Sequence, residues 1–280
     1  MKNRIGGLML YKELLIKDIE PKLSSSLAKL RIYISNPNEA VTYRPGLLIC
    51  PGGGYMMTSP REAEPIAFRF LSEGLNCFIL DYSTYQKYPT PHLEVAAAMK
   101  YIRDHEKEFK LIKNSLSLIG FSAGGHLVGS FGYLYKEIAP KLGYNPNTIK
   151  PKALIMSYPV TLMNENSHRE TREIITGKEK QLDMKLNIPT NVTKDYPPAF
   201  IWATQDDEMV PVINTLEMEK ALKDNDVKHQ CIVYESGRHG LSTANREVYI
   251  KEELTKNMLE VRDWASKASD FIFEILDHDN

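Results

Sequence analysis

The sequence predicts an α/β protein with a mostly parallel central sheet and helices on both of its faces. Short apolar segments alternate with segments of helical periodicity along most of the chain. One apolar segment runs through a glycine–serine–glycine turn directly into a helix. The 280 residues, 42% of them hydrophobic, can bury one large core, so we expect residues 1–280 to form a single domain.

Seven segments have the pattern of β-strands. Residues 27–34 alternate between apolar and polar side chains, which is typical of a half-buried strand. The other segments are almost continuously apolar, as in strands that helices cover on both faces. In chain order, the predicted strands are 27–34, 46–50, 76–81, 116–119, 153–157, 199–203 and 230–234.

Apolar residues at helical spacing predict the helices between these strands. In residues 61–72 the spacing places Ile66, Ala67 and Phe70 on one face, and residues 93–109 follow the same rule. The remaining predicted helices begin at Ala123 or cover 212–223 and 257–276.

Residues 161–198 interrupt this alternation. The segment is polar and charged, and its helices are at most short, such as 167–176. It is too long for a plain connection, and long loops at the carboxyl face of such a sheet usually have a function. We therefore expect a cap insertion over the site, rather than a solvated insertion without a role in substrate contact. Its scattered apolar residues are expected to seat it on the sheet.

The motif Gly120-Phe121-Ser122-Ala123-Gly124 is the most informative part of the chain. A serine on a tight bend between a strand and a helix has its hydroxyl exposed at the top of the sheet. Cβ atoms at Gly120 and Gly124 would collide across this bend. The N–H of Ala123 lies at the helix start, where free donors and the helix dipole favour a developing negative charge. Ser122 is therefore the candidate nucleophile for acyl transfer.

A serine nucleophile needs a base, and the base needs an orienting acid. With this turn, the expected chain order is serine, acid, histidine. His239 follows the last predicted strand in a glycine-flanked loop and is the candidate base, whereas His126, four residues after Ser122, is expected to pack. The acid is expected in Asp206-Asp207-Glu208, and the local pattern alone leaves the choice among the three open.

Pro51-Gly52-Gly53-Gly54-Tyr55 follows a predicted strand, and its glycines have no side chains to keep the amides from a substrate oxygen. Each such donor stabilises a tetrahedral oxyanion by on the order of 3 kcal/mol. A plain glycine-rich turn is the alternative, while a phosphate-binding loop would need a lysine and a serine or threonine that this segment lacks. Tyr55, Met56 and Met57 are expected to wall off a shallow acyl pocket.

Five motifs in chain order resemble those of the α/β-hydrolase superfamily, in particular its acetyl esterase branch. This branch is related to acetylxylan esterases and hormone-sensitive-lipase-like enzymes. The motifs are Pro51-Gly52-Gly53-Gly54-Tyr55, Arg61-Glu62-Ala63-Glu64-Pro65, Gly120-Phe121-Ser122-Ala123-Gly124-Gly125-His126, Asp207-Glu208-Met209-Val210-Pro211 and Gly237-Arg238-His239-Gly240. The resemblance covers roughly residue 47 to the end and implies an α/β-hydrolase fold with a small cap insertion.

The resemblance also assigns roles to residues. It implies that Asp207, which is shortly followed by Val-Pro, is the acid. It implies an oxyanion hole formed by Gly53, Gly54 and Ala123. Many relatives begin the glycine loop with histidine where this chain has Pro51. Because proline fixes φ and lacks an N–H, we expect the loop to be anchored differently.

Composition argues against several other classes of protein. The net charge of −1, with both signs interspersed, gives no electrostatic case for nucleic acid or an anionic membrane. Cys50, Cys77 and Cys231 lie in apolar segments as expected free thiols, without the spacing of a disulfide framework or metal site. The apolar stretch near the N-terminus is interrupted by Lys12 and Glu13, which leaves it too short for a signal peptide. We expect a cytoplasmic protein without a metal or cofactor.

Together the motifs predict a serine esterase that removes short acyl groups, above all acetyl, from carbohydrates or other small alcohols through an acyl-enzyme. The expected partner is a small-molecule ester, such as an acetylated oligosaccharide. A serine peptidase of the prolyl-oligopeptidase type is one alternative, but it usually carries a large additional domain for which this chain is expected to have no room. A non-catalytic ligand-binding protein on a hydrolase fold is the other, and it would not need Ser122, Asp207 and His239 together.

Overall fold

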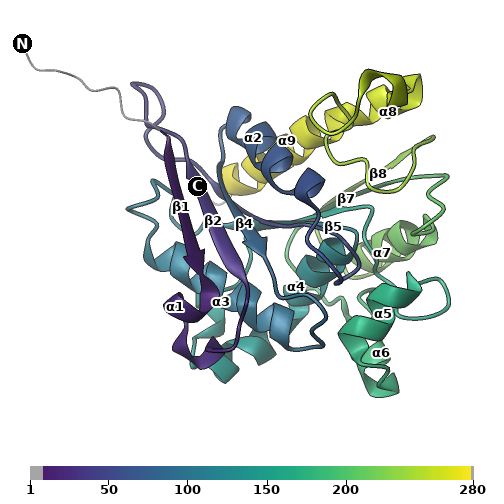
Figure 1. Ribbon diagram of the computed structural model, residues 1–280, viewed down its shortest axis with the longest axis horizontal. Coiled ribbons are helices and arrows are strands. Elements are labelled where there is room, and N and C mark those ends of the chain that lie inside the picture. Colours follow the sequence, from purple (N-terminus) through teal and green to yellow (C-terminus); the bar gives the residue numbers. More distant parts are fainter. Residues whose placement is uncertain (1–8, 279–280) are drawn as a thin grey trace, which may run out of the picture.

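In the computed structural model, which describes residues 9–278, eight strands form one sheet (Figure 1). They are β1 (Leu10–Leu15), β2 (Lys29–Ile34), β3 (Gly46–Cys50), β4 (Asn76–Asp81), β5 (Ser117–Phe121), β6 (Leu154–Ser157), β7 (Ala199–Thr204) and β8 (His229–Tyr234). Their order across the sheet is β1-β2-β4-β3-β5-β6-β7-β8. Strands β3 to β8 are parallel, and β1 and β2 join by antiparallel pairing. The predicted mostly parallel sheet is confirmed.

Helices cover both faces of the sheet (Figure 1). On one face lie α2 (Glu64–Ser72), α8 (Lys256–Glu260) and α9 (Trp264–Asp277), and on the other α1 (Ile16–Ile19), α3 (Thr90–Asp104), α4 (Ala123–Leu142) and α7 (Ile213–Asp224). Two short helices, α5 (Arg169–Thr176) and α6 (Lys180–Leu186), and 3₁₀ turns at 21–23, 60–62, 146–148, 189–191, 251–253 and 261–263 complete the described elements. Within β3, Leu48 belongs to the core under α3 and α4, and Ile49 to the core under α2 and α9. A strand buried on both faces explains the continuous apolar pattern.

Strand β1 is an element that the sequence pattern does not predict. It pairs with β2 along its whole length, from Leu10 opposite Ile34 to Leu15 opposite Lys29. It is the edge strand of the sheet, and its side chains are exposed or half-buried. A strand with so little buried surface needs no apolar alternation, so hydrophobic periodicity cannot identify it.

Two predicted helices have other bounds in the structure. The helix expected at 93–109 ends at Asp104, and the chain then turns and reaches Lys110 with a φ of 52°, which no α-helix contains. The helix expected at 257–276 is divided into α8 and α9 by the 3₁₀ turn at 261–263. Side chains three residues apart lie above one another in such a turn, and Val261 and Trp264 are both fully buried.

The bend between β5 and α4 carries Ser122 in a conformation that L-residues rarely adopt, with φ of 52° and ψ of −116°. A Cβ at Gly120 would overlap the backbone of Gly124, and a Cβ at Gly124 would overlap the carbonyl oxygen of Cys50. Both separations lie below 3.0 Å, which real Cβ atoms essentially never show. Only glycine allows β3, β5 and α4 to meet this closely, as predicted.

Gly124→Ala is expected to destabilise the protein by about 3 kcal/mol or more, because the added methyl group meets backbone atoms that cannot move aside. The measurement is urea unfolding followed by circular dichroism. Gly46→Ala is a matched control, since its Cβ would meet the flexible end of Leu116, whose Cδ1 lies 3.0 Å away. Equal losses in the two variants would contradict the backbone clash.

Candidate active site

The glycine loop, residues 51–57, begins beside Ser122. Cys50 at the end of β3 pairs in register with Gly120 of β5. Because the two strands are parallel neighbours, the loop after Cys50 and the bend that carries Ser122 leave the sheet at the same carboxyl edge. Crevices at this edge are the usual ligand sites of such sheets.

The other two candidate residues reach the same edge from β7 and β8. Thr204 and Tyr234, the last residues of these strands, are paired in register. Asp207 follows β7, and His239 lies in residues 235–242 after β8, here called the histidine loop. The structure therefore brings the side chains of a predicted acid and the predicted base to one end of the sheet.

Ser122, His239 and Asp207 form a continuous hydrogen-bonded series. Ser122 Oγ lies 2.8 Å from His239 Nε2, and His239 Nδ1 lies 2.6 Å from Asp207 Oδ2. The other Asp207 oxygen accepts the N–H groups of Met209 and Val210, both at 2.9 Å. The Asp207 carboxylate is buried, whereas Ser122 keeps 9% of its surface exposed. With its proton on Nδ1, the imidazole directs a lone pair at the serine hydroxyl, an arrangement suited to proton abstraction.

The neighbouring acids have other surroundings. Asp206 accepts the hydroxyl of Ser236 at 2.6 Å and the N–H of Gly237 at 2.7 Å. These two hydrogen bonds hold the pKa of Asp206 below its ordinary value. Asp206 thus secures the start of the histidine loop, and Glu208 is exposed. Of the three adjacent acids, Asp207 is the one that accepts a hydrogen bond from the imidazole of His239. The sequence pattern does not reveal this role of Asp206. The feature that could have indicated it is the pair of small residues, Ser236 and Gly237, that follows the adjacent strand β8.

The glycine loop is anchored through its first two residues. Tyr82 donates its hydroxyl to the carbonyl of Pro51 at 2.8 Å, and the N–H of Gly52 donates to Glu62 Oε2 at 2.8 Å. These two hydrogen bonds anchor a loop that begins with proline. The bond to Glu62 also removes the Gly52 N–H from the groups that could bind a substrate oxygen.

Three backbone N–H groups, two in the glycine loop and one at the start of α4, are candidates for the oxyanion hole. Within residues 9–278, the N–H groups of Gly53, Gly54 and Ala123 donate to no protein acceptor. Gly53 and Gly54 have φ values of 121° and 66°, which glycine adopts without strain. Ala123 is the first residue of α4, so its N–H has no partner inside the helix. Their role as the oxyanion hole stays a prediction.

His126 is a packing residue, as the sequence predicts. Its Nδ1 lies 2.9 Å from the hydroxyl of Tyr55, and its Nε2 lies 3.0 Å from the carbonyl of Leu186. Complete burial lowers the pKa of His126 to about 4, so the ring is neutral near pH 7. Tyr55 is fully buried in this contact and cannot wall off an acyl pocket. Met56 and Met57, with 36% and 51% of their surface exposed, remain for that role.

Residues 161–198 rest on the domain through buried apolar side chains and backbone hydrogen bonds. Ile175, Leu186 and Ile188 have no exposed surface, which agrees with the seating expected from the sequence, whereas Met184 has 74% of its surface exposed and does not seat the segment. At the start of the segment, the N–H groups of Thr161 and Leu162 donate to the side-chain oxygen of Asn214 in α7, at 3.0 and 3.1 Å. The segment also lies beside the glycine loop, because a Cβ at Gly54 would stand 3.7 Å from atoms of His168 and Thr171.

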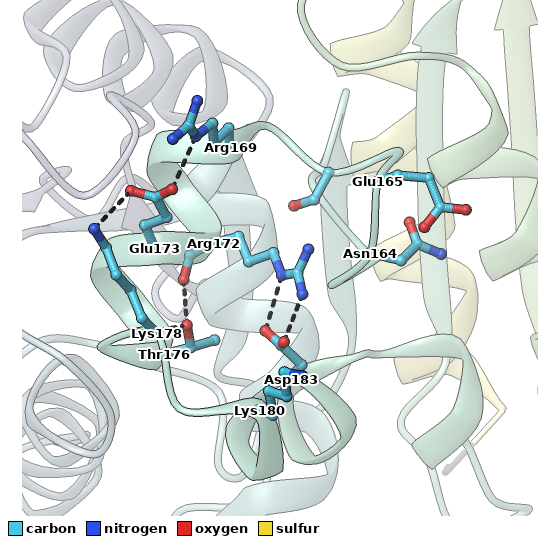
Figure 2. A pocket seen from close by; sticks show the side chains of 10 residues that line it. Asn164, Glu165, Arg169, Arg172, Glu173, Thr176, Lys178, Lys180 and Asp183 are labelled. Carbon is cyan, nitrogen blue, oxygen red and sulfur yellow. Dashed lines mark hydrogen bonds and ion pairs between the residues drawn. The ribbon is translucent and has the colours of Figure 1, made fainter.

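A polar pocket of about 470 Å³ lies within this segment (Figure 2). Its lining residues are Asn164, Glu165, Ser167, Arg169, Arg172, Glu173, Thr176, Lys178, Lys180 and Asp183. Figure 2 shows that several of these charged residues pair with one another: Arg172 binds Asp183 through two hydrogen bonds of 2.9 and 2.5 Å, and Glu173 binds Arg169 at 2.8 Å. Ser122, Asp207 and His239 do not line this pocket, so it is separate from their hydrogen-bonded series.

Within residues 9–278, neither a buried thiol nor a metal-binding cluster offers a second reactive centre. Burial raises the pKa of the Cys50 thiol, which opposes formation of a nucleophilic thiolate. No cluster of three or more histidine, cysteine or acidic side chains is placed to hold a metal ion in the part of the chain that the structure describes. Over residues 9–278, no helix has the length and apolar character needed to cross a bilayer.

Comparison with known proteins places the chain among hydrolases. Residues 30–222 match the model of the BD-FAE family. Endo-1,4-beta-xylanase B of Butyrivibrio fibrisolvens is 30% identical over 215 residues, which are 72% of this chain and 33% of that protein. An acetylxylan esterase of Xylanibacter ruminicola is 30% identical over 199 residues, which are 68% of this chain and 39% of that protein. The matched segments thus span less than half the length of these two relatives.

Solved structures match over nearly their full length. An acetyl ester-xyloside bifunctional hydrolase from Caldicellulosiruptor lactoaceticus has a TM-score of 0.81 and 26% identity, and the match covers 96% of this chain and 98% of that one. A sugar hydrolase (YeeB) from Lactococcus lactis has a TM-score of 0.79 and 29% identity, and the match covers 96% and 99% of the two chains.

Asp207→Asn is expected to lower kcat for p-nitrophenyl acetate by about 10⁴-fold, because the amide favours the wrong imidazole tautomer. Asp206→Asn is the matched control, since Asp206 contacts Ser236 and Gly237 rather than the ring. The control is expected to retain activity within about tenfold of the wild type. A larger loss in Asp206→Asn than in Asp207→Asn would contradict the assignment of the acid.

His126→Asn is expected to reduce the free energy of unfolding less at pH 5 than at pH 7.5. The folded pKa of His126 is about 4, while an unfolded histidine titrates near pH 6.5. Between these values the unfolded state binds more protons, so the contribution of His126 is complete above about pH 6.5 and is lost as the pH falls toward 4. The deficit should shrink by about 2 kcal/mol between pH 7.5 and 5 in urea unfolding. A deficit that is independent of pH would contradict a neutral, buried ring.

Proposed function

Because the chain belongs to the BD-FAE family, an α/β-hydrolase family, we propose that it is a serine esterase that removes short acyl groups, above all acetyl, from carbohydrates or other small alcohols. The membership confirms the predicted resemblance to α/β hydrolases with acetylxylan esterase relatives. The observation that carries the proposed activity is the series of Ser122, His239 and Asp207, with distances of 2.8 and 2.6 Å, beside unengaged backbone N–H groups.

In the proposed mechanism, Ser122 Oγ attacks the ester carbonyl carbon while His239 Nε2 takes the hydroxyl proton. Asp207 holds the Nδ1–H and stabilises the imidazolium that forms. The N–H groups of Gly53, Gly54 and Ala123 bind the oxyanion. The imidazolium then protonates the leaving alcohol, and an acyl-serine remains. Water attacks the acyl-serine with the same base, and the acid is released with Ser122 restored.

Two lines of observation support a short acyl group and a hydroxylated alcohol. The apolar residues Ile175, Leu186 and Ile188 of the segment 161–198 are buried, so they offer no surface to a long acyl tail. Each buried methylene of such a tail would contribute about 0.8 kcal/mol to binding. An acetylxylan esterase and an acetyl ester-xyloside hydrolase among the similar proteins support an acetylated carbohydrate.

The domain organisation and location are part of the same proposal. Residues 161–198 are proposed to be the cap of a single domain, and their contact with Gly54 of the glycine loop supports this role. A cytoplasmic location is supported by the three cysteines, which are free thiols.

Activity of the purified protein on p-nitrophenyl acetate, butyrate, octanoate and palmitate, and on acetylated xylo-oligosaccharides, tests the function. We expect kcat/KM to be highest with the acetyl esters and nearly absent with palmitate. Ser122→Ala is expected to lower kcat by on the order of 10⁴-fold or more. Ser72→Ala, on an exposed hydroxyl at the end of α2, is the control and should retain activity.

Three outcomes would contradict the proposal. A maximum at octanoate or beyond would indicate a lipase-like enzyme, and faster cleavage of aminoacyl amides would indicate a peptidase. Absence of both hydrolysis and fluorophosphonate labelling in the folded protein would favour a ligand-binding protein on the same fold.

A further inference from the structure

Glu62 is a buried acid that the proposed mechanism does not use. It belongs to the Arg61–Pro65 motif, in the 3₁₀ turn that precedes α2, and only 4% of its surface is exposed. A buried carboxyl group is costly unless hydrogen bonds satisfy its oxygens. The groups that hydrogen-bond to Glu62 therefore indicate its role.

Each oxygen of Glu62 binds a different part of the site. Oε2 accepts the N–H of Gly52 in the glycine loop at 2.8 Å. Oε1 accepts the hydroxyl of Tyr158, which follows β6, at 2.7 Å. The same hydroxyl accepts the N–H of Ser242 in the histidine loop at 3.0 Å. One carboxylate thus connects two loops whose residues lie about 190 positions apart in the chain.

Further contacts tie the same turn to the histidine loop. The ring of Tyr158 packs edge-on against the imidazole of His239, with centroids 5.1 Å apart and an interplanar angle of 71°. The Ser242 hydroxyl donates to the carbonyl of Arg61, and the Arg61 guanidinium donates to the carbonyl of Gly240 at 3.4 Å.

We propose that Glu62 is a positioning residue that couples the oxyanion-binding glycine loop to the loop that carries the catalytic histidine. This inference rests on the proposed function. By holding Gly52 N–H, Glu62 orients the peptides that follow, so that the Gly53 and Gly54 N–H groups face the substrate oxygen. Through Tyr158 it holds the histidine loop, so the donors and the base keep one relative placement during the reaction.

The carboxylate is the form of Glu62 that suits this role. Ionised, it only accepts hydrogen bonds, and both its partners are donors. Burial raises the pKa of Glu62 above its ordinary value, and the hydrogen bonds from Tyr158 and Gly52 oppose this shift because they favour the carboxylate. A glutamine has one acceptor and one donor at these positions, so it cannot accept from both partners.

The test compares Glu62→Gln and Tyr158→Phe, singly and together, with Glu64→Gln as the matched control. Glu64 lies two residues away, has half of its side chain exposed, and binds Tyr33 and Arg31 instead. Glu62→Gln is expected to lower kcat for p-nitrophenyl acetate by on the order of 10- to 100-fold, with KM within about twofold, because it misplaces groups that act on the transition state. The control should keep kcat within about twofold.

The double variant tests the coupling itself. If Glu62 acts on the histidine loop through Tyr158, the double variant should lose little more activity than the more damaging single variant. Losses that multiply, or equal kcat values for Glu62→Gln and Glu64→Gln, would overturn the proposal. Where Glu62→Gln fails to fold, Tyr158→Phe alone carries the kcat comparison.

Amide hydrogen exchange separates this proposal from the proposed function. Glu62→Gln should speed exchange at both Gly52 and Ser242, and Tyr158→Phe should speed it at Ser242, whereas Glu64→Gln should change neither. This holds even for a wild-type protein without esterase activity, in which case only the proposed function fails. Unchanged exchange at Ser242 in both variants would overturn the coupling in either case.

Discussion

Close backbone contact where β3, β5 and α4 meet is the constraint on which the rest of the site depends. Gly124 stands so near the Cys50 carbonyl that no side chain fits between them. This contact forces the chain through the unusual conformation of Ser122 and sets the first N–H of α4 beside the glycine loop. One close backbone contact thus places the proposed nucleophile Ser122, the expected oxyanion donor Ala123, and the glycine loop that holds the other two expected donors.

Around this contact, the buried polar side chains of the site have hydrogen-bond partners. Asp207 binds two backbone N–H groups as well as the imidazole, and His126 has a hydrogen-bond partner at each ring nitrogen. Such satisfied networks are rigid, because breaking one bond leaves a buried group without a partner. The rigidity suits chemistry that depends on fixed distances between donor, base and nucleophile.

The segment 161–198 is attached differently from these buried polar networks. Buried apolar side chains such as Ile175 and Leu186 seat it, and several of its charged residues pair with one another, as with Arg172 and Asp183. Its link to the catalytic edge runs through His126, whose ring joins Tyr55 of the glycine loop to Leu186 of the segment. A surface segment that is attached in this way can vary in sequence without disturbing the sheet.

The sequence by itself determined the parallel sheet, the serine bend and the order of the reactive groups. These depend on neighbouring residues: apolar runs form buried strands, and glycines flank a serine where a strand turns into a helix. Tertiary structure decided the rest. Asp206, Asp207 and Glu208 share one local pattern, which does not distinguish them. The way β7 and β8 end side by side brings Asp207, the acid that the family resemblance implies, to His239. The partners of Glu62 and His126, and the edge strand β1, are likewise invisible in the sequence. Hydrogen bonds between distant residues leave no periodic signal, and an exposed edge strand needs no apolar face.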